Sequence, residues 1–224
     1  MLHLRVYLLI LLLGVPFATE VVLAEDITLL PKYGSLPKNE AQNIADEKFL
    51  SSMDTYYKGD RKKAAEDASA RGWQFLRKGN LPDAMRRFNQ AWLIDHANGS
   101  ALWGMAAIQA NTGKPADSLT LFGEAEPILG GDIDFCVDHA KALGIAGVQT
   151  KNEALLQDAL ARFAHLYEKA LQHTLNLQNW AITLFYVGNY VEAWKKIRLA
   201  EATPRRAELD PKFIAALQSK MPRP

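Results

Sequence analysis

Histidine is the residue of this chain best suited to binding a metal, and its spacing argues against a metal site. The five histidines stand at positions 3, 96, 139, 165 and 173. Only His165 and His173, with Glu168 between them, lie close enough in sequence to share one ion. A zinc site needs ligands in tetrahedral array, whereas a trio along one helix at this spacing is typical of a solvated face. The sequence predicts no bound metal.

Nucleophilic chemistry is equally poorly supported. Cys136 is the single cysteine, so no disulfide can form within the chain. It falls in an apolar helical pattern, where a buried structural thiol is the expected role. The sequence has no H-E-x-x-H motif, no glycine-rich phosphate loop and no G-x-S-x-G elbow. We therefore expect no catalytic residue and no cofactor.

The overall charge gives no reason to expect a nucleic-acid ligand. Lysine and arginine together number 26, and aspartate and glutamate number 25. Such a balance creates no field that would attract nucleic acid or an anionic membrane. The short basic runs at residues 61–63, 86–87 and 195–196 have acidic neighbours, which is typical of solvated helix faces.

The first 24 residues have the layout of a secretory signal peptide. Arg5 supplies the positive start, residues 6–15 are apolar, and Val22 and Ala24 are small residues that a signal peptidase accepts. The apolar run is too short to span a bilayer, and no cysteine follows it as a lipid attachment site. We expect cleavage near Ala24 and a periplasmic or secreted protein without membrane insertion. The alternative is an uncleaved anchor.

The elements that would position any site recur at a fixed spacing. Gly79, Gly113 and Gly147 are 34 residues apart, as are Phe88 and Phe122. A period of this size is the signature of stacked helix–turn–helix units. The sequence thus predicts an all-α protein.

The repeating residues identify a known pattern. In the unit that starts at Ala65, small and aromatic residues recur at Gly72, Phe75, Gly79, Ala84, Phe88 and Ala91. This arrangement resembles the tetratricopeptide repeat, and the likeness extends over about residues 65–204. The resemblance implies a right-handed α-solenoid of antiparallel helix pairs.

The repeat pattern divides the chain into successive units. After the signal peptide (1–24) we expect an extended leader (25–37), a helix packed on the repeats (38–58), four repeats (65–98, 99–132, 133–173 and 174–207), and a C-terminal capping helix and tail (208–224). In the third repeat Asn152 stands where alanine is expected, and the apolar pattern runs on to about Leu171. We interpret this repeat as degenerate, with an elongated second helix that absorbs an insertion of 7 residues.

The resemblance also implies where a partner would bind, because the first helices of such repeats line a concave groove. The residues at the corresponding positions are Ser69, Trp73, Leu76, Arg77, Trp103, Ala107, Asn111, Val137 and Lys141. Trp73 and Trp103 should be neighbours there and form an apolar patch with polar edges, the kind of surface at which binding energy concentrates. The alternative is that residues 31–57 fold over both indoles and make them ordinary core.

Three hypotheses for function follow. The first is a non-catalytic scaffold of the cell envelope that binds a protein or an extended peptide in the concave groove. The second is a structural or self-associating subunit, a homo-oligomer in which Phe213, Ile214 and Leu217 would bury against another copy. The third is a protein that binds a small ligand or acts on cell-wall material.

Overall fold

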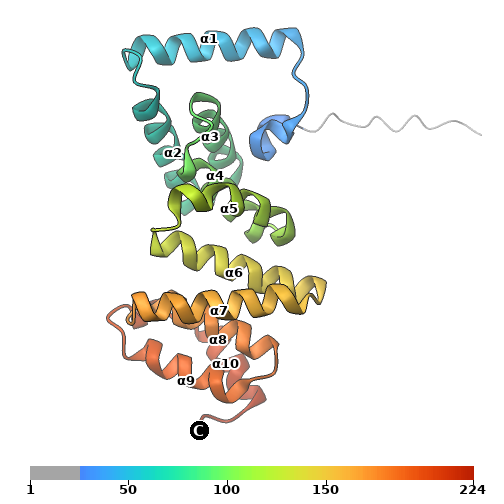
Figure 1. Cartoon of the computed structure of the whole chain (residues 1–224), viewed down its shortest axis with the longest axis vertical. Helices are drawn as coiled ribbons and strands as arrows, with labels where there is room; N and C mark the ends of the chain where they lie inside the picture. Colours follow the sequence, from blue (N-terminus) through green and yellow to red (C-terminus); the bar gives the residue numbers. More distant parts are fainter. Residues whose placement is uncertain (1–25) are drawn as a thin grey trace, which may run out of the picture.

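The computed structural model describes residues 26–224, and this part of the chain consists of helices and turns (Figure 1). The expected signal peptide at residues 1–24 lies outside the described residues. Four consecutive helix pairs form the body of the molecule: α2 (Arg61–Arg77) with α3 (Leu81–Ile94), α4 (Gly99–Asn111) with α5 (Pro115–Leu129), α6 (Ile133–Thr150) with α7 (Glu153–Lys169), and α8 (Thr174–Tyr186) with α9 (Tyr190–Glu201). The prediction of an all-α solenoid of helix pairs is confirmed.

Local sequence signals explain where most of these helices begin and end. The turn from α2 to α3 uses Gly79 at a φ of +73°, a conformation that glycine adopts without steric cost. Asn80 then caps α3, because its side chain accepts a hydrogen bond from the backbone N–H of Asp83. Gly113 and Gly188 make the matching turns in the second and fourth pairs.

The small residues of the pattern allow neighbouring helices to approach closely. Phe88 of α3 is fully buried, and its ring lies against Gly72 of α2 and Gly104 of α4. A Cβ atom at Gly104 would come within 2.1 Å of that ring. The first core cluster therefore depends on two glycines facing one phenylalanine.

The third pair differs from the prediction in where its extra length lies. α6 begins at residue 133 and α8 at residue 174, so this unit is seven residues longer than the second, which runs from 99 to 132. The added length is shared by both helices, which have 18 and 17 residues, and is not confined to the second. Gly147 consequently lies inside α6, and Lys151 makes the turn at a φ of +54°.

The prediction of an extended leader at residues 25–37 is wrong. The described part of the leader forms two 3-10 segments, η1 (Ile27–Leu29) and η2 (Pro31–Ser35). They dock on α3 because the buried side chain of Asn89 donates hydrogen bonds to the carbonyl oxygens of Thr28 and Leu30. In Figure 1 this blue segment returns toward α3 and α5 from the end of α1 (Glu40–Tyr56).

The helix expected at 38–58 corresponds to α1, which packs on the repeats only through its C-terminal half. Phe49, Leu50, Met53 and Tyr57 contact a small cluster made by Ala64, Ala65 and Ile94. No residue of α1 is buried. The helix crosses the end of the solenoid in Figure 1, and no residue of 26–57 belongs to the cluster that holds Trp73 and Trp103.

The other end of the solenoid is closed by α10 (Pro211–Lys220), which follows the short segment η3 (Arg206–Glu208). Phe213 and Leu217 are buried against Trp194 and Ile197 of α9. The indole nitrogen of Trp194 also donates to the carbonyl oxygen of Met221 at 3.0 Å. Phe213 and Leu217 thus form the core of this cap within one chain and Ile214 is half-buried beside them, while self-association stays a hypothesis.

Candidate functional site

The two tryptophans predicted to be neighbours are in contact. The ring centroids of Trp73 on α2 and Trp103 on α4 lie 4.9 Å apart at an angle of 67°. Trp73 also packs edge to face on Phe88, and Trp103 does the same on Phe135. The pair thus connects the first helices of consecutive repeats to the core beneath them.

Both indole nitrogens are already used inside the protein. Trp73 Nε1 donates to the hydroxyl oxygen of Ser100 at 2.9 Å, and Trp103 Nε1 donates to Oδ2 of Asp138 at 3.0 Å. Both tryptophans are half-buried. The indoles therefore form a fixed wall along the first helices of the repeats, and neither has a free N–H group to offer a ligand.

The remaining predicted residues divide by exposure. Ser69 and Val137 are buried, and the Ser69 hydroxyl donates to the carbonyl oxygen of Glu66 within its own helix. Ala107 is also buried at 8% exposure. Their small or apolar side chains pack between helices, and Ala107 also borders a small hollow between α4 and α6.

Four predicted residues do reach the surface. Arg77 and Asn111 are exposed, whereas Leu76 and Lys141 are half-buried. Among these four residues, Lys141 borders a pocket. That pocket lies between the third and fourth repeats, further along the chain than the tryptophan pair.

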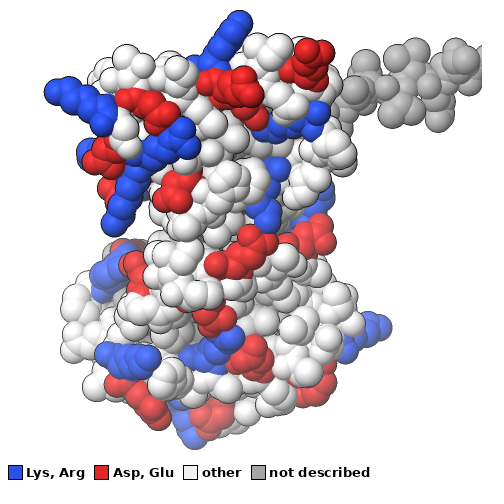
Figure 2. Space-filling view, turned by 45° about the horizontal axis from the view of Figure 1, so that its top comes forward, with Lys and Arg blue, Asp and Glu red and all other residues white. Residues whose placement is uncertain are grey.

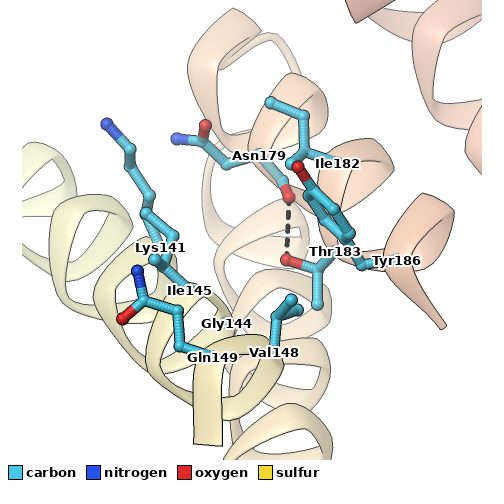
Figure 3. A pocket seen from close by; sticks show the side chains of 9 residues that line it. All are labelled: Lys141, Gly144, Ile145, Val148, Gln149, Asn179, Ile182, Thr183 and Tyr186. Carbon is cyan, nitrogen blue, oxygen red and sulfur yellow. Dashed lines mark hydrogen bonds between the residues drawn. The ribbon is translucent and has the colours of Figure 1, made fainter. Parts of the chain in front are cut away.

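This pocket has a volume of about 350 Å³ and lies between α6 and α8, the first helices of the third and fourth pairs (Figure 3). Its lining residues are Lys141, Gly144, Ile145, Val148, Gln149, Asn179, Ile182, Thr183 and Tyr186. The walls are mainly aliphatic and aromatic. Polar groups are supplied chiefly by the Lys141 ammonium and by the amides of Gln149 and Asn179. We call this space the α6–α8 pocket.

Two features of the sequence create the α6–α8 pocket. Gly144 lets the helices approach closely, since a Cβ atom there would lie 2.7 Å from the Thr183 hydroxyl oxygen. The longer α6 runs on to Thr150 and so carries Val148 and Gln149 along the side of the pocket. Thr183 itself donates to the carbonyl oxygen of Asn179 at 3.0 Å, which leaves its methyl group for the pocket (Figure 3).

The α8 half of this pocket was not predicted, although the repeat pattern contains the signal for it. The groove positions that yield Lys141 in the third repeat yield Ile182 and Tyr186 when they are counted from Thr174 in the fourth. Tyr186 is 61% exposed. Applying the same groove positions to the fourth repeat would have identified both Ile182 and Tyr186.

A small hollow between the pocket and the tryptophan wall shares Lys141 and Ile145 with the pocket, and Asp138, which also borders it, accepts the hydrogen bond from Trp103. This hollow of about 20 Å³ lies between α4 and α6 and is also bordered by Asn111. Burial raises the pKa of Asp138, although the hydrogen bond from Trp103 and the charge of Lys141 oppose this effect. We call the α6–α8 pocket together with this small hollow and the tryptophan wall the concave groove.

The histidines considered for metal binding are separate in space and function. His173 caps α8: its Nδ1 accepts from the backbone N–H of Asn176, and its Nε2 lies 2.9 Å from Oδ1 of Asp134. His165 lies near Glu168 alone. Over residues 26–224, no three His, Cys, Asp or Glu side chains gather into a potential metal site.

Two further surface properties concern partners. In the described part of the chain, no helix has the length and apolarity required to cross a membrane. Figure 2 shows acidic and basic side chains interspersed over the face that it displays. The absence of a nucleic-acid partner stays a prediction.

Solved structures resemble this fold at low sequence identity. The thermophilic TPR protein TTC0263 of Thermus thermophilus superimposes with a TM-score of 0.61 and 16% identity, over 71% of this chain and 84% of that one. YrrB, described as a TPR protein with an unusual peptide-binding site, gives a TM-score of 0.52 and 20% identity, over 80% of this chain and 86% of that one. Neither the protein-family models nor the curated proteins give a match. The fold is thus that of the tetratricopeptide-repeat solenoids.

Proposed function

We propose that the protein is a scaffold that binds an extended peptide segment of a partner protein in the concave groove. The observation that supports this proposal most strongly is the α6–α8 pocket, an apolar hollow on the inner face of the solenoid with polar groups beside it. Pockets with this composition hold apolar groups and orient them with a few hydrogen bonds. YrrB, which shares the fold, is described as peptide-binding.

The lining residues suggest how such a segment would be held. Ile145, Val148 and Ile182 offer aliphatic contacts for one apolar side chain of the peptide. Lys141 and Asn179 lie near each other at one end of the pocket, where an ammonium and an amide can bond to backbone carbonyl groups (Figure 3). The helices on either side are fixed by core packing, so little ordering is needed on binding.

Tyr186 provides the sharpest test of this assignment. Its exposed ring borders the pocket, so Tyr186→Ala removes contact area for a ligand while leaving the core intact. Peptides selected from a random display library on the full chain should lose about tenfold or more in affinity for Tyr186→Ala, because each 1.4 kcal/mol of lost binding energy is a factor of ten. Isothermal titration calorimetry measures the change.

A matched control is available in Tyr56, which is 77% exposed at the end of α1 and away from the groove. Tyr56→Ala should bind the selected peptides as the wild type does. Equal affinity of all three proteins would show that the peptides bind elsewhere and would remove the basis of this proposal.

The cellular location of this activity is a second part of the proposal. The pattern in residues 1–24 supports export, which would place the scaffold in the cell envelope or outside the cell. Its partners would then be exported or envelope proteins. N-terminal sequencing of the mature protein tests this part independently of binding.

A further inference from the structure

The leader is held on the outer face of the solenoid by side chains that contact it as they would contact a bound peptide. Asn89 of α3 is fully buried and donates to the carbonyl oxygens of Thr28 and Leu30 at 2.9 and 2.8 Å. These bonds recognise the backbone of the leader. They do not depend on which chain the leader belongs to.

Two ion pairs fix the direction of the leader on this surface. Arg86 Nη2 of α3 lies 3.3 Å from Oδ2 of Asp26, and Lys32 Nζ lies 2.7 Å from Oε1 of Glu124 on α5. The leader therefore carries an acidic residue at one end and a basic residue at the other, and its site carries the opposite charges in matching order. We call this surface of α3 and α5 the leader site.

The connection between the leader and the repeats is weakly anchored. α1 has 17 residues, none of them buried, and its first half contributes nothing to the cluster that holds its second half. Ile44 in that first half is 43% exposed. The first half of α1 would therefore lose little packing energy if the leader moved away from the leader site of its own chain, and the contacts given up would be those of the leader itself.

The turn that brings the leader back beneath α1 is strained. Lys32, Tyr33 and Ser35 have φ values of 51°, 56° and 53°, in the left-handed region that side chains with a Cβ atom disfavour. Gly34 between them has a φ of 70°. The ion pair of Lys32 and the stacking of Lys38 Nζ over the Tyr33 ring at 3.9 Å hold this turn closed. Straightening the turn would relieve the strain and carry the leader outward.

We propose that the leader exchanges between two copies of the chain, each leader occupying the leader site of its partner in a reciprocal dimer. Every contact between the leader and the leader site is then re-formed between chains, while residues 33–35 leave the left-handed conformation. Exchange of an identical element is a low-cost route to a two-fold dimer when the hinge is strained. This interface lies on the outer face, so it leaves the concave groove open and does not depend on the function proposed for it.

Charge reversal separates exchange from docking within one chain. One full-length variant carries Asp26→Arg and Lys32→Glu; the other carries Arg86→Asp and Glu124→Lys. In each variant alone both ion pairs become repulsive, within a chain and between identical chains. In a mixture each leader meets a complementary site only on the other variant.

Size-exclusion chromatography with light scattering gives the result. We expect each variant alone to be a monomer and the equimolar mixture to form a one-to-one dimer of twice the chain mass. A mixture that remains monomeric at submillimolar concentration, or variants that dimerise alone as readily as together, would overturn the proposal. Circular dichroism of each variant checks that it is folded.

A second measurement keeps the proposal testable if the charge variants fail to fold. Lys32→Cys and Glu124→Cys are combined in a chain in which Cys136→Ser removes the native thiol, and the pair is joined by a short bismaleimide. Crosslinks between chains should increase with protein concentration at the expense of those within a chain. Crosslinks confined to single chains at every concentration would contradict exchange.

Discussion

The indole nitrogen of Trp103 donates a hydrogen bond to Oδ2 of Asp138, joining the first helix of the second repeat to that of the third across 3.0 Å. Through this bond the tryptophan wall is fixed to α6, which also carries Lys141, Ile145 and Val148 of the α6–α8 pocket. Together with the packing of Trp103 on Phe135 of α6, this bond sets the position of the wall relative to the pocket.

Removing the acceptor of this bond should destabilise the protein. In Asp138→Ala the half-buried N–H of Trp103 loses its partner, and an unsatisfied group of this kind costs about 1–3 kcal/mol. Asp138→Asn retains a carbonyl oxygen that can accept the same bond, so its cost should be smaller. Denaturant unfolding of both variants measures the difference. Identical free energies of unfolding for the two would mean that the bond contributes nothing.

His139 should make the stability of the fold depend on pH. It is 5% exposed, stacks on Phe122, and lies near Glu126 and Arg162. Burial, together with the charge of Arg162, lowers the pKa of His139 below its ordinary value of 6.5, although Glu126 and Asp158 oppose this. The folded state thus keeps His139 neutral while the unfolded chain takes up a proton, so the free energy of unfolding should fall as the pH drops below about 6.5.

The substitution His139→Phe tests this directly, because it keeps an aromatic ring against Phe122 and removes the titrating group. The variant should lose less stability than the wild type between about pH 7 and about pH 5, the range over which histidine ordinarily titrates. Melting temperatures recorded across that range are sufficient. Parallel curves for the two proteins would show that His139 is not the group responsible.

The contact between Phe88 and Gly104 should be intolerant of change on either side. Phe88→Ala would leave a cavity in the first core cluster and cost about 3–5 kcal/mol. Gly104→Ala would place a methyl group against the ring and cost about 1–3 kcal/mol through overpacking. In the double variant the second penalty should largely disappear, since the ring is gone. Strict additivity in the unfolding free energies would contradict this contact.

Processing of the N-terminus is expected to leave Glu25 as the first residue of the exported protein. Cleavage there would release the leader with Asp26 close to a free amino terminus. Edman or mass-spectrometric sequencing of protein recovered from the envelope fraction decides the matter. A protein that still begins with Met1 after export would support the uncleaved anchor instead.

Most of the solenoid could be predicted because its small residues recur. Gly72 and Ala84 are small where helices cross, and the turn residues Gly79 and Asn80 follow at the expected places. Information of this kind is local and repeats along the chain. One sequence is therefore sufficient to recognise it.

The missed features depend on single contacts between distant residues. The break between α6 and α7 falls at Lys151, which adopts a left-handed conformation without being glycine. The local signal there is Asn152, whose side chain caps α7 by accepting a hydrogen bond from the backbone N–H of Leu155. The docked leader depends on Asn89, about 60 residues further along the chain, a separation over which periodicity gives no information. The α8 side of the pocket, in contrast, could have been found by extending the repeat positions to Ile182 and Tyr186.

The most direct test of the central claim is to locate a bound peptide on the surface. A photoreactive amino acid is placed at Gln149, on the border of the α6–α8 pocket, and in a control protein at Gln157, an exposed glutamine on α7 of the outer row of helices. Peptides selected on the unmodified chain should crosslink from position 149 and not from 157. Equal crosslinking from both positions, or crosslinking from 157 alone, would contradict a ligand bound in the concave groove.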